Sequence, residues 1–256
     1  NTDNQIVDGT KYGRCERINT CGYILYPEKT GDSEQYERGK NKVLPPIETP
    51  SYIPPELVES TLCKFETNIF FLWLVKIFGD EVAKLLQVRY NIGTAKGGGT
   101  IFWQQDKAGN YRTGKVMYYT TNGKRDKNHN SWYLHNKVSE NYVLKQVFFG
   151  EHLITTGSSI ALCESEKTAI VMSVFNPELI WLAAGGSEMI NAYRLTRIPS
   201  LSIVYPDNGM RDKWTAKTKF LNPQIDNSVD AAVASGELPA GSDILDLMLL
   251  TNRLTF

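Results

Sequence analysis

Short apolar runs alternate with helical segments in the C-terminal part of the chain, from about residue 151 onward. Three such runs lie at residues 159–163, 179–184 and 201–205. The segments that follow them, at 166–175, 188–195 and 213–220, have the apolar spacing of helices. Short buried strands separated by helices predict an α/β fold, in which helices flank both faces of a mostly parallel sheet.

The preceding region has a mixed pattern. Residues 67–87 predict one or two amphipathic helices with a break near Gly79. Strand-like runs at 100–104 and 111–120, joined by a segment that contains Gly109, predict a β-hairpin. The first 55 residues show little periodicity, and their prolines indicate an extended linker.

Composition excludes few classes of function. The chain has 28 Lys plus Arg and 28 Asp plus Glu, so it has no overall electrostatic attraction to nucleic acid, although a local basic strip could supply one. No apolar run approaches the roughly 20 residues that span a bilayer, and no signal-peptide pattern is present at the start. We therefore expect a cytoplasmic protein without a membrane partner. The first residue is Asn1 rather than Met, and we interpret the sequence as a fragment or a processed product.

Two acidic residues directly follow predicted strands. Ligands of parallel sheets bind beyond the carboxyl ends of the strands, where Glu164 and Asp207 are placed. Carboxylates there could hold Mg²⁺ or act as a general acid or base, but an acid at a strand end is also a common helix cap. Lys167 lies in the first helical turn after Glu164, where it would be close to a bound phosphate or would simply pair with Glu164 or Glu166.

The order of these elements resembles the Toprim domain of primases and topoisomerases. The matching segments are Glu164, Glu166-Lys167-Thr168-Ala169, Ala184-Gly185-Gly186 and Asp207-Asn208-Gly209. The resemblance implies a Rossmann-like Toprim fold in which Glu164 and Asp207 bind Mg²⁺ or Mn²⁺ and Lys167 steadies a phosphate. Asp243 and Asp246 resemble the acidic segment that often closes the Toprim region of primases, which would make them further metal ligands. An acidic start to an amphipathic helix is equally ordinary.

The chain departs from the Toprim pattern at one place. Toprim domains usually have Asp-x-Asp after the third strand, whereas this window contains only Asp207. Either Tyr205 replaces the first acidic residue, or Gly209 replaces the second. We prefer the first alternative because it keeps the usual distance to the glycine, and we expect a reduced affinity for metal.

Basic and aromatic residues alternate between residues 90 and 150. Cations that neutralise phosphates and rings that stack on bases are typical of single-strand binding, although a plain β-hairpin with solvated lysines gives a similar pattern. Segments 90–94, 101–104, 112–118, 123–125 and 149–153 resemble the region that precedes Toprim in primase-like proteins of bacterial mobile elements. The resemblance implies that four cations face nucleic acid: Arg112, Lys115, Lys124 and Arg125.

Two further features belong to this comparison. Cys15 and Cys21 resemble the second half of the zinc ribbon that begins many primase-like proteins, but a structural zinc site needs four ligands and no upstream pair is present. We therefore expect that zinc is absent. His152, beside Glu151, is interpreted as a hydrogen-bonded residue between the two halves or as a general base.

These observations divide the chain into three parts: a zinc-ribbon remnant with a linker (1–55), an α+β primase-like region that binds nucleic acid (56–150) and a Toprim domain (151–256). The expected function is Mg²⁺-dependent nucleotidyl transfer on single-stranded DNA, with nucleoside triphosphates as substrates and a helicase as a further partner. Two alternatives stay open. One is a Toprim-type nuclease, and the other is a non-catalytic nucleic-acid-binding protein of replication or mobilisation, which the missing Asp favours.

Overall fold

The computed structural model describes residues 13–14, 24–25 and 49–251 of the 256-residue chain. The chain divides into two compact units, residues 1–49 and 50–256. In the first unit, β1 (Gly13–Arg14) pairs antiparallel with β2 (Ile24–Leu25). Cys15 and Cys21 lie outside the described residues, so the zinc-ribbon remnant and the absence of zinc stay predictions.

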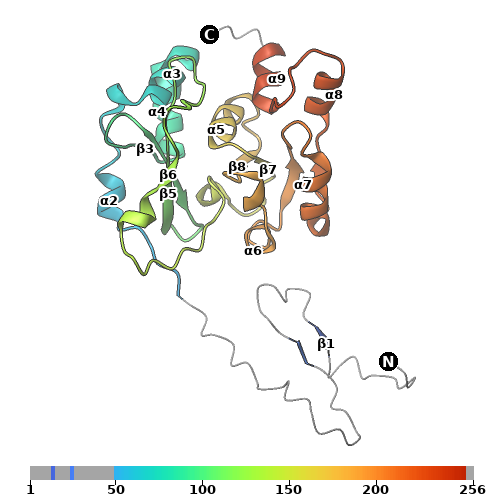
Figure 1. Cartoon of the computed structure of the whole chain (residues 1–256), viewed down its shortest axis with the longest axis horizontal. Coiled ribbons are helices and arrows are strands. Elements are labelled where there is room, and N and C mark those ends of the chain that lie inside the picture. Colours follow the sequence, from blue (N-terminus) through green and yellow to red (C-terminus); the bar gives the residue numbers. More distant parts are fainter. Residues whose placement is uncertain (1–12, 15–23, 26–48, 252–256) are drawn as a thin grey trace, which may run out of the picture. The chain divides into compact units, whose positions relative to one another are not determined.

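The second unit begins with helices and an antiparallel sheet (Figure 1). The helices are α2 (Pro55–Glu59), η1 (Phe65–Thr67), α3 (Ile69–Phe78) and α4 (Asp80–Arg89). The sheet has the order β3-β4-β5-β6, with strands β3 (Ile92–Thr94), β4 (Thr100–Gln105), β5 (Tyr111–Met117) and β6 (Trp132–Tyr133). The short helices η2 (Leu134–Lys137) and η3 (Glu151–Leu153) follow it.

Local sequence explains the α3–α4 pair. The Asn68 side chain accepts a hydrogen bond of 3.2 Å from the Phe71 N–H, and so caps the start of α3. Gly79 separates the helices with a φ of 85°, a conformation that glycine adopts without steric cost. The predicted break near Gly79 is confirmed, as is the hairpin formed by β4 and β5.

The rest of the unit is built on a four-stranded parallel sheet of order β10-β9-β7-β8. Its strands are β7 (Ile160–Cys163), β8 (Ile180–Ala183), β9 (Leu201–Val204) and β10 (Gln224–Ile225). Its helices are α5 (Glu166–Phe175), η4 (Ser187–Met189), α6 (Ala192–Leu195), α7 (Arg211–Thr218), η5 (Lys219–Leu221), α8 (Ser228–Ala234) and α9 (Ile244–Thr251). The three predicted strands and the helix over 166–175 are confirmed.

The predicted helix over 188–195 is wrong in one respect, because two short helices occupy this stretch. Asn191 has an extended backbone, and its side chain accepts a hydrogen bond from the Arg194 N–H. This cap starts a new helix, α6, after η4 has ended.

Apolar side chains cover both faces of the parallel sheet. One cluster contains Ala161 and Trp181 together with residues of α5, and it continues into α3, α4 and the antiparallel sheet. A second cluster, with Leu162 and Trp214, lies beneath α6 and α7. The protein therefore has a mixed α/β fold whose parallel sheet is covered by helices, as the alternating pattern predicts.

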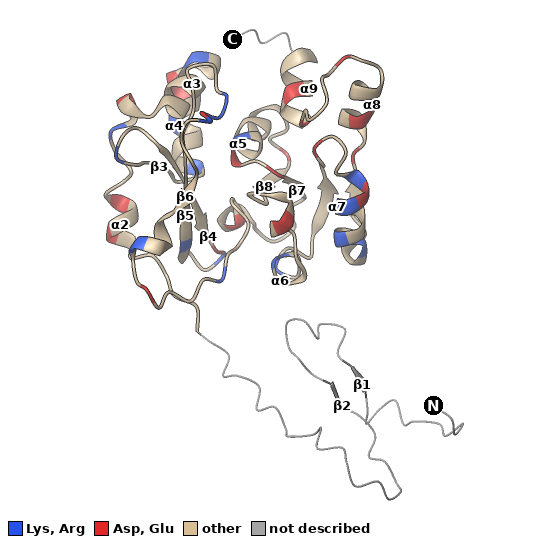
Figure 2. Cartoon of the chain, viewed as in Figure 1, with Lys and Arg blue, Asp and Glu red and all other residues tan. Residues whose placement is uncertain are grey.

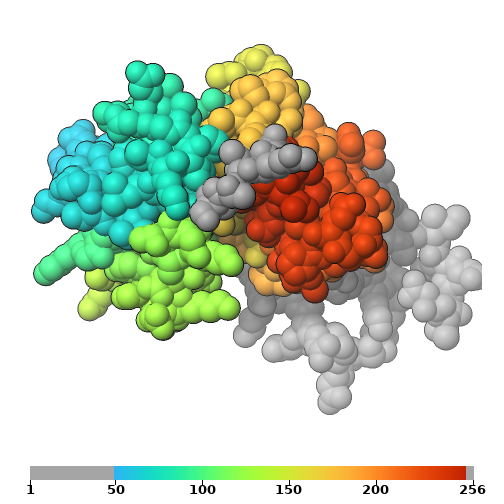
Figure 3. Space-filling view, turned by 90° about the horizontal axis from the view of Figure 1, so that it is seen from above, coloured from blue at the N-terminus to red at the C-terminus, as the bar shows by residue number. Residues whose placement is uncertain are grey.

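Phe149, which lies between the two sheets in sequence, connects the parallel sheet to α4. Phe149 exchanges backbone hydrogen bonds of 3.1 Å with Ala183 at the edge of β8, and its ring stacks on Tyr90 at 5.3 Å. Seen from above, the antiparallel part (blue to green) and the parallel part (yellow to red) abut directly (Figure 3). Within the described residues, no helix is long and apolar enough to cross a bilayer.

Candidate functional site

Four carboxylates gather at the carboxyl-end edge of the parallel sheet. Glu164 follows β7, Asp207 follows β9, and Asp243 and Asp246 lie at the start of α9. Thr168 of α5 donates a hydrogen bond of 2.6 Å to Asp243, which holds the start of α9 against the first turn of α5. The topology thus brings the predicted acidic residues together, although they are far apart in sequence.

Their charges are close enough to act on one another. Burial, and then the charges of Asp243, Glu164 and Asp246, raise the pKa of Asp207 to about 8. Burial also raises the pKa of Glu164, against the opposing effect of Lys115. Within residues 49–251, none of these carboxylates forms an ion pair with a cationic side chain. The edge therefore holds four carboxyl groups that nearby lysines influence without forming a direct ion pair.

The raised pKa of Asp207 predicts how stability depends on pH. The pKa of Asp207 rises from 3.8 to about 8 on folding, so between these values the folded state binds a proton that the unfolded state has lost. Stability from this residue is fully present below pH 3.8 and is lost as the pH rises through about 8. We expect Asp207→Asn to match the wild type near pH 4 and to exceed it by roughly 2–3 kcal/mol near pH 8.5, allowing for partial exposure. Urea unfolding in EDTA would show this, whereas parallel pH profiles would contradict it.

The donor set suits a hard divalent cation. Mg²⁺ is usually bound by one or two carboxylates and keeps several of its waters. In the described part of the chain, no three His, Cys, Asp or Glu side chains are gathered closely enough to hold one ion. Glu164 and Asp207 fit a cation held by one or two carboxylates, and the neighbouring carboxylates Asp243 and Asp246 would favour it.

Besides contributing negative charge to the site, Asp243 and Asp246 have a structural role. The Asp243 N–H donates to the Asp246 carboxylate and the Asp246 N–H donates to the Asp243 carboxylate, both at 3.0 Å. This reciprocal cap satisfies backbone donors at the start of α9. A metal-binding role for these two residues stays a prediction.

Tyr205 belongs to the core beside the site. Its ring stacks on Trp181 with a centroid distance of 5.0 Å and an interplanar angle of 24°. Burial raises the pKa of Tyr205, and the charges that add to this effect come from Asp226 and Glu178 rather than from the four site carboxylates. At the other position of the Asp-x-Asp window, the Gly209 N–H donates to Asp230 at 2.9 Å. Either alignment therefore leaves Asp207 as the acidic residue of this loop that faces the cluster.

Lys167 does not form the predicted pair with Glu164 or Glu166. Its Nζ donates to the Gly123 carbonyl at 3.3 Å and lies 5.6 Å from the ring centroid of Trp73. It also lowers the pKa of Asp246. Lys167 thus joins the acidic edge to the turn after β5, and its role with phosphate stays a prediction.

Two of the four predicted nucleic-acid contacts, Arg112 and Lys115, are buried and do not lie on the surface. Arg112 is buried and pairs with Asp106 at 2.7 Å, while Lys115 is buried against Glu166. Both lie on β5 and find carboxylate partners in the interior, because a buried cation without such a partner is costly. Lys124 and Arg125 are exposed on the turn after β5. Figure 2 shows basic positions (blue) on the loop beside α3. Lys124 lowers the pKa of Asp246, so this turn adjoins the site.

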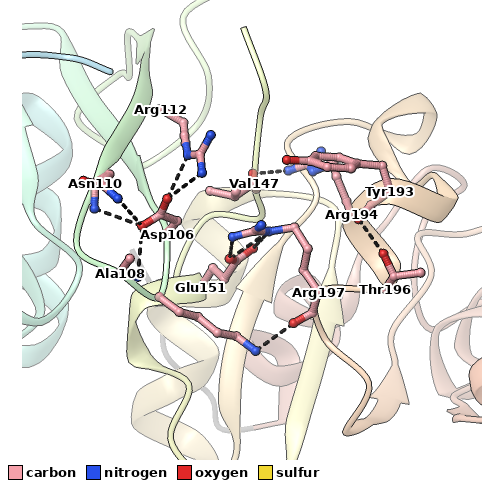
Figure 4. A network of polar contacts seen from close by, with 11 residues as sticks. Asp106, Ala108, Asn110, Arg112, Val147, Glu151, Tyr193, Arg194, Thr196 and Arg197 are labelled. Carbon is pink, nitrogen blue, oxygen red and sulfur yellow. Dashed lines mark hydrogen bonds and ion pairs between the residues drawn. The ribbon is translucent and has the colours of Figure 1, made fainter. Parts of the chain in front are cut away.

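Glu151 and His152 belong to the network that joins the two halves. Glu151 is fully buried and pairs with Arg197, as Figure 4 shows. His152 Nε2 donates to the Arg89 carbonyl at 2.9 Å, and burial lowers the pKa of the ring. The structure therefore agrees with the interpretation of His152 as a hydrogen-bonded residue between the two halves.

Comparison with known proteins identifies the family. The sequence model described as "Domain of unknown function (DUF6371)" matches residues 68–208, which is more than half of the chain. The chain belongs to the DUF6371 family. The matched region runs from the cap of α3 to the Asp207 loop, and so contains the antiparallel sheet, three of the four strands of the parallel sheet and two of the site carboxylates.

Solved structures resemble this DUF6371 chain only weakly. The primase fragment of the bacteriophage T7 primase-helicase protein is 15% identical with a TM-score of 0.41, covering 66% of this chain and 70% of that chain. A T7 lagging-strand DNA polymerase complex with primase domains of two gp4 subunits, an RNA/DNA hybrid and dTTP gives 15% identity and a TM-score of 0.34, covering 60% and 81%. No curated protein matches the sequence.

The DUF6371 chain also has site residues that sequence reasoning missed. Lys213 of α7 lowers the pKa of Glu164. Arg194 of α6 is buried and donates to the Ala184 carbonyl at 2.9 Å. The sequence indicates Glu166 as a helix start and as a candidate partner of Lys167, whereas in the structure it is the buried partner of Lys115. In the sequence, the only indication of this pair is that Lys115 lies within a strand, between Gly114 and Val116.

Proposed function

We propose that this chain is a Toprim-type, primase-like protein that acts on nucleic acid at the acidic edge formed by Glu164 and Asp207. The observation that carries this proposal is the placement of Glu164 and Asp207 after the neighbouring parallel strands β7 and β9. There, burial first and then the charges of Asp243, Glu164 and Asp246 raise the pKa of Asp207 to about 8. A divalent cation would relieve the repulsion between these charges and attract phosphates at the same place. The order of the Toprim-like motifs supports the same assignment.

The proposed chemistry is nucleotidyl transfer. A cation bound at Glu164 and Asp207 would neutralise charge on the phosphates as a 3′-hydroxyl attacks the α-phosphate of a nucleoside triphosphate. The chain itself would place the reacting groups: Asp243 orders the start of α9 through its cap, and Lys167 stands between Trp73 and the acidic edge. Single-stranded DNA is the proposed template.

A second function has an observation of its own. Within the described residues, no three candidate ligands form a ready cluster, and Tyr205 stacks in the core at the window where Toprim domains usually have an acidic pair. These features favour a protein that binds nucleic acid without catalysis, in replication or mobilisation of a genetic element.

One assay separates the candidates. The chain is incubated with single-stranded DNA, labelled nucleoside triphosphates and Mg²⁺ or Mn²⁺, and new oligonucleotides are resolved on a gel. Metal-dependent products support nucleotidyl transfer, and shortening of labelled DNA without nucleoside triphosphates indicates a nuclease. DNA binding in the absence of both products indicates the non-catalytic protein.

The exposed turn after β5 gives a separate prediction for binding. Lys124→Ala with Arg125→Ala removes two exposed cations next to the site, so single-stranded DNA should bind more weakly. Because each phosphate contact adds about 0.7 to the slope of log affinity against log salt, the slope should fall by roughly 1.4. Fluorescence anisotropy over a salt series measures it. Lys84→Ala, an exposed cation on α4 paired with Asp80, serves as the control and should leave the slope unchanged.

A further inference from the structure

One lysine of the antiparallel sheet reaches into the parallel half. Lys115 Nζ donates to both carboxylate oxygens of Glu166 and to the Gly185 carbonyl, each at 3.0 Å. An ammonium group has three N–H donors, so this arrangement uses its full donor capacity. Lys115 belongs to β5, Glu166 begins α5, and Gly185 lies in the turn after β8.

Burial makes this ion pair costly to form, because both charges lose their hydration. The Glu166 side chain is 2% exposed and that of Lys115 is 11% exposed. A buried ion pair adds little net stability over apolar side chains of similar size, because desolvation of the two charges offsets their attraction. Stability alone therefore gives a weak reason for this pair, and its third hydrogen bond, to a backbone carbonyl, indicates a positional role.

The turn that Lys115 holds is in direct contact with Glu164. The Gly185 N–H donates to the Glu164 carbonyl at 2.8 Å, and the Ser187 N–H donates to the Glu164 carboxylate. Gly185 has a φ of 80°, and a Cβ at this position would lie 2.9 Å from Glu166 Oε1. Glycine is thus required both for the backbone conformation and for room beside the ion pair.

We propose that Lys115 is a positioning residue of the acidic site, which anchors Glu166 and the Gly185 carbonyl and thereby fixes the Glu164 carboxylate. This inference rests on the proposed function of Glu164. It makes the site composite: the parallel half supplies the carboxylates, and the antiparallel half supplies the cation that holds one of them in place.

The test separates positioning from stability. Lys115→Met alone leaves Glu166 buried without its partner, whereas Lys115→Met/Glu166→Met removes both charges and should regain the stability lost in the single variant. Both variants lack the anchor of the Gly185 carbonyl. Calorimetry and electron paramagnetic resonance with Mn²⁺ alone should show at least about tenfold weaker binding in both, as is typical when a group that orients a metal ligand is lost.

Arg112→Met is the matched control, since it removes another buried cation of the same strand. Its Mn²⁺ affinity should stay close to that of the wild type. Hydrogen exchange at Gly185 and Ser187 gives a readout without metal, and it should be faster in the double variant than in Arg112→Met. A stable double variant with wild-type exchange at these amides would overturn the inference. Absence of Mn²⁺ binding in the wild type would instead count against metal binding in the proposed function, and the exchange result would still decide the role of Lys115.

Discussion

Arg197→Met is expected to lower the free energy of unfolding by about 3–5 kcal/mol. The reason is Glu151, whose side chain is fully buried. Arg197 Nε donates to both carboxylate oxygens at 3.0 and 3.1 Å, and Nη2 adds a further contact (Figure 4). Without the guanidinium, a buried carboxylate would be left without its ion-pair partner.

Urea unfolding at neutral pH measures the effect, and a second variant isolates its cause. Glu151→Gln/Arg197→Met removes the stranded charge, so we expect it to recover much of the loss. The Lys107 contact to the Arg197 carbonyl involves only backbone on that side and survives both changes. A loss below about 1 kcal/mol in the single variant, as for an exposed ion pair, would show that water reaches Glu151.

Glu164→Gln is expected to reduce Mg²⁺-dependent oligonucleotide synthesis by at least about 100-fold, equivalent to roughly 3 kcal/mol in the activation free energy. The amide keeps the size of the side chain but removes a negative charge at the edge where the cation is proposed to bind. Asp207→Asn should have a similar effect. Affinity for single-stranded DNA should change little, because the proposed phosphate contacts lie on the turn with Lys124 and Arg125.

Glu188→Gln is the control for this second prediction. Glu188 is exposed near the site and pairs with Lys213 and Lys217, so its replacement removes a nearby charge but no proposed ligand. Product formation is measured with labelled nucleoside triphosphates at several Mg²⁺ concentrations. Unchanged synthesis in Glu164→Gln would refute the assigned role, and residual activity restored only at high Mg²⁺ would locate the defect in metal affinity.

The sequence predicts the parallel sheet and its acidic edge because both depend on local order. A short apolar strand followed by a helix fixes where the strand ends, and so places Glu164 and Asp207 at the same edge. β10 was not predicted, since a strand as short as Gln224–Ile225 has no measurable periodicity. The predicted helix is divided at Asn191 because the Asn191 side chain caps a new helix. The spacing of apolar residues gives no sign of this cap.

The environments of cations are harder to predict than those of apolar residues. Lys115 and Lys124 have the same expected role in the sequence, yet one is buried and the other exposed. The difference comes from Glu166, a partner 51 residues away from Lys115, which only the packing of the two halves brings into reach. From sequence alone, a lysine in a strand is therefore expected to be exposed to solvent. Only a tertiary contact such as that with Glu166 shows that it is buried.

The shared apolar cluster that runs from α3 through Phe149 to Trp181 has a consequence for the history of this family. If one half were transferred to another gene, each half would expose an apolar face that only the other half covers, so the product would be prone to aggregate. Recombination can therefore tolerate breakpoints before Pro50 far better than near Gly150. The two sheets are expected to have been inherited together as one exchangeable module, which agrees with a family match that runs from α3 through the antiparallel sheet into β7, β8 and β9.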